Sequence, residues 1–236
     1  MSKAKTQQSE CDFLVIFCTI KFPRSLKSVA AFQTKAPRMR LSFQKQQFAA
    51  REDAILDAVN VLLAKKGFDL MTMDDVAAEV GIAKGSLYKH FASKESLAAA
   101  ALCRMTRDTI DVLAAMPPEL APIDKLKATL RWALERRLKG AVPHLPSTSV
   151  ALQRSLMLNL SYVRLIMKLN AELKLLVIAA QNEGALDRTL PNEVIVYTIY
   201  ARSCDPTLEY LRKSGRYDDV QTVDFLVRTC FEGLNG

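Results

Sequence analysis

The sequence predicts an all-α fold, with three short helices near the N-terminus followed by a longer helical bundle. Apolar residues recur three and four positions apart through most of the chain after residue 49, which is the spacing of a helix with one buried face. Glycine and proline number only 8 and 9 among 236 residues, and 50% of the residues are hydrophobic. This composition favours a packed core over a loop-rich or disordered chain, and no pair of strands with alternating polarity is present.

The first predicted helix runs from about Ala49 to Lys66. Its apolar residues share one face, and Gly67 is expected to end it; they are Ile55, Leu56, Val59, Leu62 and Leu63.

Two short amphipathic segments follow, separated by a turn at Gly81. Thr72 is expected to cap the first segment, and Asp74 and Asp75 suit the positive end of its dipole. Gly81 stands where the chain needs a residue that tolerates positive φ. The second segment places Leu87 on an apolar side and basic or hydroxyl residues on the other, so the pair predicts a helix-turn-helix. Pattern alone leaves open an ordinary pair of surface helices with a solvated charged face.

A longer helix is expected from a Ser93 cap to Ala115, where three prolines at 117, 118 and 122 interrupt the chain. This helix would belong to both halves of the protein, and its inward residues are Leu97, Ala101, Met105, Ile110 and Leu113.

Beyond the prolines, helices are predicted over 124–139 and 160–183, with a loop over 140–149 between them and Gly184 as a C-terminal cap. Residues 192–213 begin with a β-branched run that also suits a buried strand. However, Val194, Tyr197 and Ala201 follow helical spacing, and Pro206 is expected either to kink this helix or to start a new one behind Asp205. The last helix carries Val220, Val223, Val227, Cys230 and Leu234.

Charge is unevenly distributed along the chain. The formal net charge is +8, but residues 1–51 contain ten Lys or Arg and two acids, whereas residues 52–236 contain 23 of each. We therefore expect a basic, flexible extension over 1–45. Within the helix-turn-helix, Lys84, Lys89 and Lys94 lie close together, and this local placement favours nucleic-acid binding.

Other classes of site find little support. The five cysteines (Cys11, Cys18, Cys103, Cys204 and Cys230) fit neither a zinc site nor a disulfide framework, and a reducing cytoplasm suits them. The apolar run Phe13–Ile20 is shorter than the ~20 residues that span a bilayer. No metal-ligand spacing, phosphate loop or nucleophile elbow is present, so we expect no cofactor, metal or catalytic residue.

Residues 51–102 resemble the tetracycline-repressor-like (TetR) family of bacterial transcription regulators. The family pattern Gly-x-Leu-Tyr-x-His-Phe-x-x-Lys-Glu-x-Leu is matched at Gly85, Leu87, Tyr88, His90, Phe91, Lys94, Glu95 and Leu97. The resemblance implies phosphate contacts from Thr72, Tyr88, His90 and Lys94, and base or backbone contacts from Lys84, Gly85, Ser86 and Lys89. Ala83 departs from the family, which usually has Ser or Thr there. Alanine cannot cap the helix with its side chain, and the missing cap costs about 1 kcal/mol.

The resemblance also implies a division of the chain and a mode of action. A DNA-binding domain is expected over 46–102, and a helical domain for effector binding and dimerisation over 103–236. The expected function is that of a cytoplasmic homodimeric repressor, released from a palindromic operator on double-stranded DNA by a small-molecule effector.

The effector site and the dimer interface are the least specific parts of this interpretation. An apolar or aromatic effector is expected, and the candidate lining residues are Trp132, His144, Met157, Tyr162, Met167 and Tyr197. The last two helices are expected to pair across a two-fold axis, through Val194, Tyr197, Ala201, Cys204, Leu208, Leu211, Val223, Val227, Cys230 and Leu234. One alternative is a dimeric DNA-binding regulator without an effector, controlled by a protein partner or by its abundance. Another is an enzyme, although only His90 and His144 offer histidine chemistry.

Overall fold

The protein is helical throughout the part of the chain that the structure, a computed structural model, describes: residues 43–140 and 150–234, with no strand among them. This confirms the all-α prediction. The helices in chain order are α2 (Phe43–Leu70), α3 (Met73–Val80), α4 (Lys84–His90), α5 (Lys94–Ala115), α6 (Pro122–Leu138), α7 (Val150–Leu158), α8 (Leu160–Asn182), α9 (Asn192–Ser203), α10 (Thr207–Ser214) and α11 (Asp219–Phe231).

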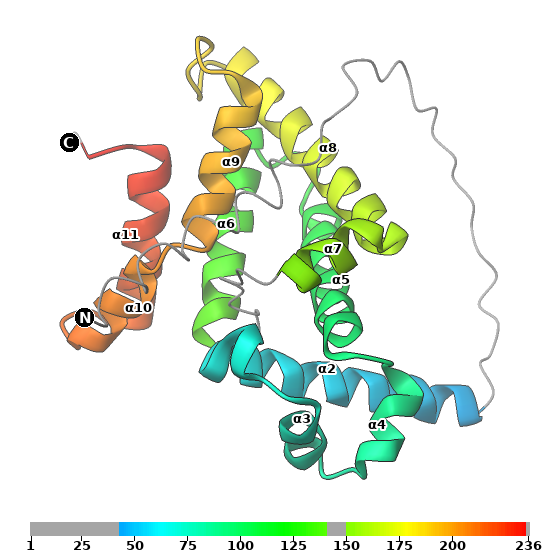
Figure 1. Cartoon of the computed structure of the whole chain (residues 1–236). Coiled ribbons are helices and arrows are strands. Elements are labelled where there is room, and N and C mark those ends of the chain that lie inside the picture. The colour runs from blue at the N-terminus through cyan, green and yellow to red at the C-terminus, as the bar shows by residue number, and fades with distance from the viewer. Residues whose placement is uncertain (1–42, 141–149, 235–236) are drawn as a thin grey trace.

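Helices α2, α3 and α4 form one end of the molecule, and α5 leaves this end to run beside α6 and α8 (Figure 1). The core of this head is built from Ile55, Val59, Leu87 and Leu97, none of which is exposed. Tyr162 of α8 belongs to the same cluster. The head is therefore packed directly against helices that lie much later in the sequence.

A second core cluster fills the space between α6, α8, α9, α10 and α11. Its fully enclosed members include Leu126, Leu134, Val177 and Leu208. Helix α5 contributes to both clusters, because Leu97 lies in the first and Ile110 in the second. The predicted domain boundary at residue 102 thus falls inside a helix shared by the two halves.

Local signals set most of the helix ends that the sequence predicts. The Thr72 side chain accepts from the Asp75 backbone N–H while the Asp75 carboxylate accepts from the Thr72 N–H, which makes a capping box. Ser93 caps α5 in the same way, with Ser96 as its partner. Gly81 has φ 73°, as expected for a left-handed helix end.

The first and later helices differ in detail from the prediction. Helix α2 begins at Phe43 rather than Ala49, and Gly67 interrupts it with φ 74° and ψ 171° before a last turn reaches Leu70. At the other end of the chain, Val194–Tyr200 is helical and not a strand. A new helix starts after Pro206, where the Asp205 carboxylate accepts from the Thr207 N–H at 2.8 Å.

Candidate DNA-binding and effector sites

Helix α4 has one buried side and one exposed side. Leu87 is fully buried and anchors the helix to the head core. Lys84, Gly85, Tyr88 and Lys89 are all exposed and repeat at a spacing that places them on a single helix face. Ala83 precedes the helix without a side-chain cap, as the sequence predicts.

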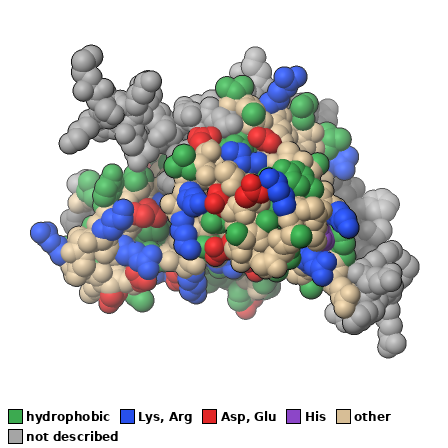
Figure 2. Space-filling model, turned by 60° about the horizontal axis from the view of Figure 1, so that its bottom comes forward, with side chains coloured by type: hydrophobic (Ala, Val, Ile, Leu, Met, Phe, Trp, Pro, Cys, Tyr) green, Lys and Arg blue, Asp and Glu red, His purple; other side chains and the backbone are tan. Residues whose placement is uncertain are grey.

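Acidic groups of α3 moderate the positive charge of this end of the molecule, where basic and acidic side chains are interspersed (Figure 2). The Lys84 ammonium lies 2.7 Å from an Asp74 carboxylate oxygen, and this hydrogen-bonded carboxylate raises the Lys84 pKa. Both side chains are more than half exposed, so the pair is weak and open to competition from another anion. The neighbouring Asp75 is held by the Lys66 ammonium and the Thr72 backbone, which lower its pKa to about 2.

Thr72 lies exposed at the beginning of α3. Its hydroxyl oxygen accepts from the Asp75 N–H at 3.1 Å, and a side-chain hydrogen bond from Thr72 helps to lower the pKa of the Asp75 carboxyl. Ser86, also predicted as a contact, is half-buried on α4.

His90 and Lys94 are placed differently from the role that the resemblance implies. The His90 side chain is only 3% exposed; its ring stacks on Phe48 with centroids 4.1 Å apart, and Nδ1 lies 3.6 Å from a Glu52 carboxylate oxygen. The Lys94 ammonium donates to the carbonyls of Phe68 and Asp69 at 3.1 and 3.3 Å, and lies over the Phe68 ring. Both side chains are therefore engaged inside the head, and we infer that neither is a phosphate contact. No local pattern in the sequence identifies Phe48 or Phe68 as their partners.

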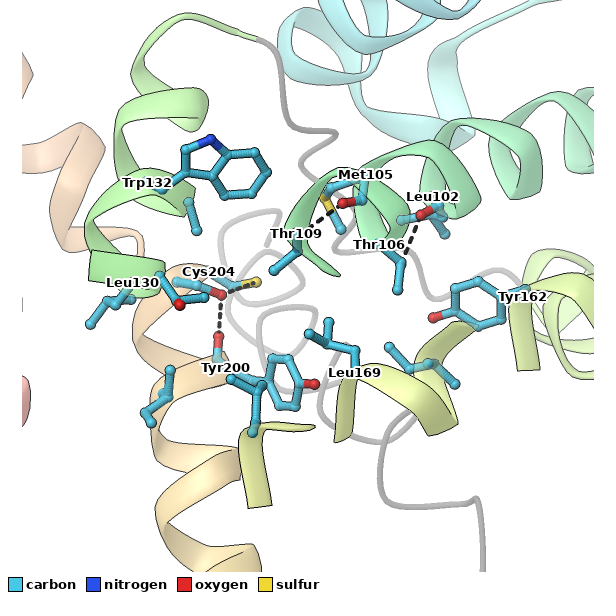
Figure 3. Close-up of a pocket in the computed structure, with 16 residues that line it drawn as sticks. Leu102, Met105, Thr106, Thr109, Leu130, Trp132, Tyr162, Leu169, Tyr200 and Cys204 are labelled. Carbon is cyan, nitrogen blue, oxygen red and sulfur yellow. Dashed lines mark hydrogen bonds between the residues drawn. The ribbon is translucent and has the colours of Figure 1, made fainter. Parts of the chain in front are cut away.

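Behind the head, α5, α6, α8 and α9 enclose a cavity of about 80 Å³ (Figure 3). Its walls are mostly apolar, with several hydroxyl groups and no charged side chain among the lining residues that the structure describes. These are Leu102, Met105, Thr106, Thr109, Thr129, Leu130, Trp132, Ala133, Tyr162, Ile166, Leu169, Leu173, Ile199, Tyr200, Ser203 and Cys204.

A buried arginine holds the helices at one edge of this cavity. The Arg137 guanidinium of α6 donates to the carbonyls of Ser203 and Asp205 at 3.0 and 3.1 Å, and to the Glu209 carboxylate at 2.8 Å. It thereby fixes the turn between α9 and α10, next to the lining residue Cys204. Burial raises the pKa of the Cys204 thiol.

The structure brings only two of the predicted effector residues to this cavity. Trp132 and Tyr162 line the cavity, but Met157, Met167 and Tyr197 do not. Met157 is 38% exposed on α7, and the other two are half-buried on different faces of α8 and α9. His144 lies outside the described residues. The lining threonines and Tyr200 were missed, because only the packing of α5, α6, α8 and α9 brings them together.

The predicted dimer residues also separate into groups. Leu208, Val223 and Val227 are at most 3% exposed and belong to the core of the chain itself, which excludes them from contact with a partner. Cys204 lines the cavity. Tyr197, Leu211 and Cys230 are half-buried, whereas Val194, Ala201 and Leu234 are exposed. The predicted interface therefore combines residues that face the core of the chain with residues that face outward.

Across residues 43–140 and 150–234, no group of three or more His, Cys, Asp or Glu side chains is arranged to hold a metal ion. No helix in these ranges is long and apolar enough to cross a membrane.

Comparison with known proteins matches the head specifically. Residues 55–101 fit the family model described as bacterial regulatory proteins, tetR family. The biofilm operon icaADBC HTH-type negative transcriptional regulator IcaR of Staphylococcus aureus (strain Newman) is 48% identical over 46 residues, which are 20% of this chain and 25% of IcaR. The match thus spans a quarter of that relative's length.

Solved structures extend the likeness to most of the chain. FadR from Bacillus subtilis, in complex with stearoyl-CoA, superposes with a TM-score of 0.60 at 15% identity, covering 78% of this chain and 99% of FadR. AibR, in complex with isovaleryl coenzyme A and operator DNA, gives a TM-score of 0.55 at 19% identity, covering 77% of this chain and 98% of AibR. At these identities the likeness shows a shared fold.

Proposed function

We propose that this chain, a member of the tetR family of bacterial regulatory proteins, is a homodimeric transcriptional repressor and not an enzyme. It binds a palindromic operator through α4 and releases it when a small, largely apolar effector enters the cavity behind the head. The observation that carries the proposal is the exposed face of α4, which presents Lys84, Tyr88 and Lys89 beside Gly85, a position without a side chain. Because its target is chromosomal DNA, the protein acts in the cytoplasm.

The DNA-binding step uses the two ends of the helix-turn-helix. A helix of this width fits the major groove of duplex DNA, where base edges can be distinguished. Lys84 is positioned for base or phosphate contact at the beginning of α4, and its weak pair with Asp74 exchanges for a stronger pair with DNA. Tyr88 and Lys89 contact phosphates that fix the helix in the groove, together with the exposed Thr72 at the beginning of α3.

The release step uses α5, which contributes both to the head core and to the cavity wall. A ligand that binds more tightly to one arrangement of α5 shifts the population toward it, and thereby changes the spacing of the two heads. The apolar lining supports an effector with a substantial apolar part. The fatty-acyl and branched-acyl coenzyme A ligands in the structures of FadR and AibR support the same inference, and the name of IcaR supports repression.

Selection of operator sequences from a random DNA library, followed by binding titrations, tests the DNA-binding step. We expect Lys89→Ala to weaken binding to all selected sequences alike and to reduce the slope of log K against log salt by about one. We expect Lys84→Ala to change which bases are preferred. Selection of no common palindrome by the wild-type protein would refute the proposal.

Screening small molecules for release of the selected operator tests the effector step. Release by an apolar compound that fails to release an Ala133→Phe variant, in which the new ring fills the cavity, would support the proposal. If the wild-type protein binds its operator but no compound releases it, the alternative of a regulator without an effector is favoured.

A further inference from the structure

One hydroxyl group in the cavity wall, that of Tyr162, faces the cavity without a hydrogen-bond partner among the described residues. Tyr162 is 3% exposed, and its hydroxyl makes no hydrogen bond with any residue that the structure describes. In Figure 3 the hydroxyl points from α8 into the cavity, toward Leu169 and away from the head. A hydroxyl that opens into a cavity and has no partner on the protein is free to donate to a molecule bound there, so this group is a candidate for contact with a ligand.

The other hydroxyl groups of the wall have committed their protons. Thr106 and Thr109 donate to carbonyls of the preceding turn of α5, each at 2.9 Å (Figure 3). Thr129 and Ser203 donate to backbone carbonyls at 2.7 Å. Tyr200 donates to the Asn170 side-chain oxygen at 2.8 Å. Among these lining hydroxyls, only Tyr162 therefore has a proton left to donate.

The remaining features of the wall define the chemistry of the molecule that fits. The indole nitrogen of Trp132 points away from the cavity in Figure 3, so it does not compete with Tyr162 as a donor. No charged side chain is among the described lining residues, and an ion would lose its hydration without compensation. Burial raises the pKa of Tyr162 above its ordinary value, which keeps the phenol protonated.

We propose that Tyr162 is the anchoring residue of the effector site, and that its hydroxyl donates a hydrogen bond to a carbonyl oxygen on an uncharged, otherwise apolar part of the ligand. This inference rests on the proposed effector function and specifies its ligand class. An acceptor oxygen satisfies the one unpaired donor, while the aliphatic wall encloses the rest of the molecule. A hydrocarbon of the same shape leaves the hydroxyl unpaired and binds less tightly.

Two uncharged probes of nearly equal shape test the proposal in the full-length protein without DNA. In 2-hexanone a carbonyl oxygen replaces the terminal methylene group of 2-methyl-1-hexene. Trp132 is the only tryptophan of the chain and lines the cavity, so its fluorescence reports binding of either probe directly. We expect the wild-type protein to bind the ketone about tenfold more tightly, as one added hydrogen bond allows.

Tyr162→Phe should abolish most of this preference by weakening ketone binding about tenfold, with little change in binding of the alkene. Tyr197→Phe is the matched control, because Tyr197 lies on α9 outside the cavity wall; its ketone preference should equal that of the wild type. Thermal melting separates ligand binding from structure. Tyr162→Phe should not lower Tm, whereas Tyr200→Phe should lower it by removing the hydrogen bond to Asn170.

Three results would overturn the assignment: an unchanged ketone preference in Tyr162→Phe, a lowered Tm in that variant, or no binding of either probe to the wild-type cavity. Operator binding and compound-induced release are measured separately. If a charged compound releases the operator while neither probe binds, the effector function stands and the ligand class proposed for Tyr162 is wrong.

Discussion

Glycine at position 85 is better explained by contact with another molecule than by the fold of this chain. It lies on the exposed face of α4 without positive φ, and a Cβ added there would meet no atom within 4 Å. The fold therefore does not require glycine at this position, although glycine weakens a helix relative to alanine. Close approach of another backbone to α4, such as that of DNA, would explain why this position has no side chain.

We expect Gly85→Ala to stabilise the free protein by about 0.5–1 kcal/mol, through higher helix propensity and a less flexible unfolded chain. We expect the same change to weaken operator binding about tenfold, because the added methyl group separates α4 from the groove. Urea denaturation and operator titration measure the two effects. Gly215→Ala is the contrasting change: Gly215 has φ +64°, so alanine should destabilise the protein. Unchanged operator affinity in Gly85→Ala would place this residue away from the DNA.

Residues of one type take different roles that their spacing does not reveal. Lys89 is exposed, whereas the Lys94 ammonium bonds to two carbonyls that lie 26 and 25 residues earlier. His90 likewise packs on Phe48, 42 positions away, in a turn of α2 that precedes the predicted start of the helix. The sequence motif identifies the head correctly. Only the packing of α2 shows which of its side chains contact other residues of the head and are not exposed.

At the level of helices, Lys94 fastens the beginning of α5 to the end of α2. Its ammonium donates to the carbonyls of Phe68 and Asp69, which lie in the last turn of α2 and have no partner within the helix, and it lies 4.4 Å from the centroid of the Phe68 ring. This arrangement couples the helix that bears the cavity wall to the first helix of the head.

We expect Lys94→Ala to lower the free energy of unfolding by about 1–3 kcal/mol, because it removes charge-assisted hydrogen bonds and a cation–π contact. Lys89→Ala, an exposed change in the same region, should stay within about 0.5 kcal/mol of the wild type. The salt dependence of operator binding should show the opposite ranking, with a reduced slope for Lys89→Ala only. A reduced slope for Lys94→Ala would return that residue to the phosphate contacts.

Helix ends were more predictable than helix partners. Thr72, Gly81 and Ser93 act within three or four residues of themselves, so the sequence identifies the boundaries that they set. The break after Asp205 is local in the same sense. By contrast, a stripe of apolar residues marks a buried face without saying what covers it. Leu208 and Val223 were therefore predicted to face a second chain, although they face the chain's own core.

For the whole molecule, the two core clusters are joined by helices that belong to both. Helix α5 carries Leu97 into the head core and Ile110 into the second, and Leu165 of α8 packs against each. The cavity lies along these shared helices, between the head and the face on which a second copy is proposed to bind. A rearrangement of the cavity wall can therefore alter the position of the head without unfolding either cluster.

Leu208, Val223 and Val227 are buried in the core of the chain itself and cannot contact a partner. The exposed face of α9 still can, and it remains part of the proposed dimer interface. Val194, Thr198 and Ala201 are exposed and recur at helical spacing along it. Ala201 leaves room for close approach of a partner helix. In a two-fold interface the same residue meets the axis from both chains, so one substitution acts twice.

We expect Ala201→Arg to produce a folded monomer, because it places two like charges near the axis and removes both from water, at a cost of several kcal/mol. Circular dichroism should show an unchanged helical content, while sedimentation shows the loss of the dimer. Operator affinity should fall steeply, since a single head makes half of the contacts. Ala171→Arg on the exposed side of α8 is the matched control and should remain dimeric. If Ala201→Arg stays dimeric and keeps its operator affinity, the interface lies on another face, for which the exposed Val220 of α11 is the next position to substitute.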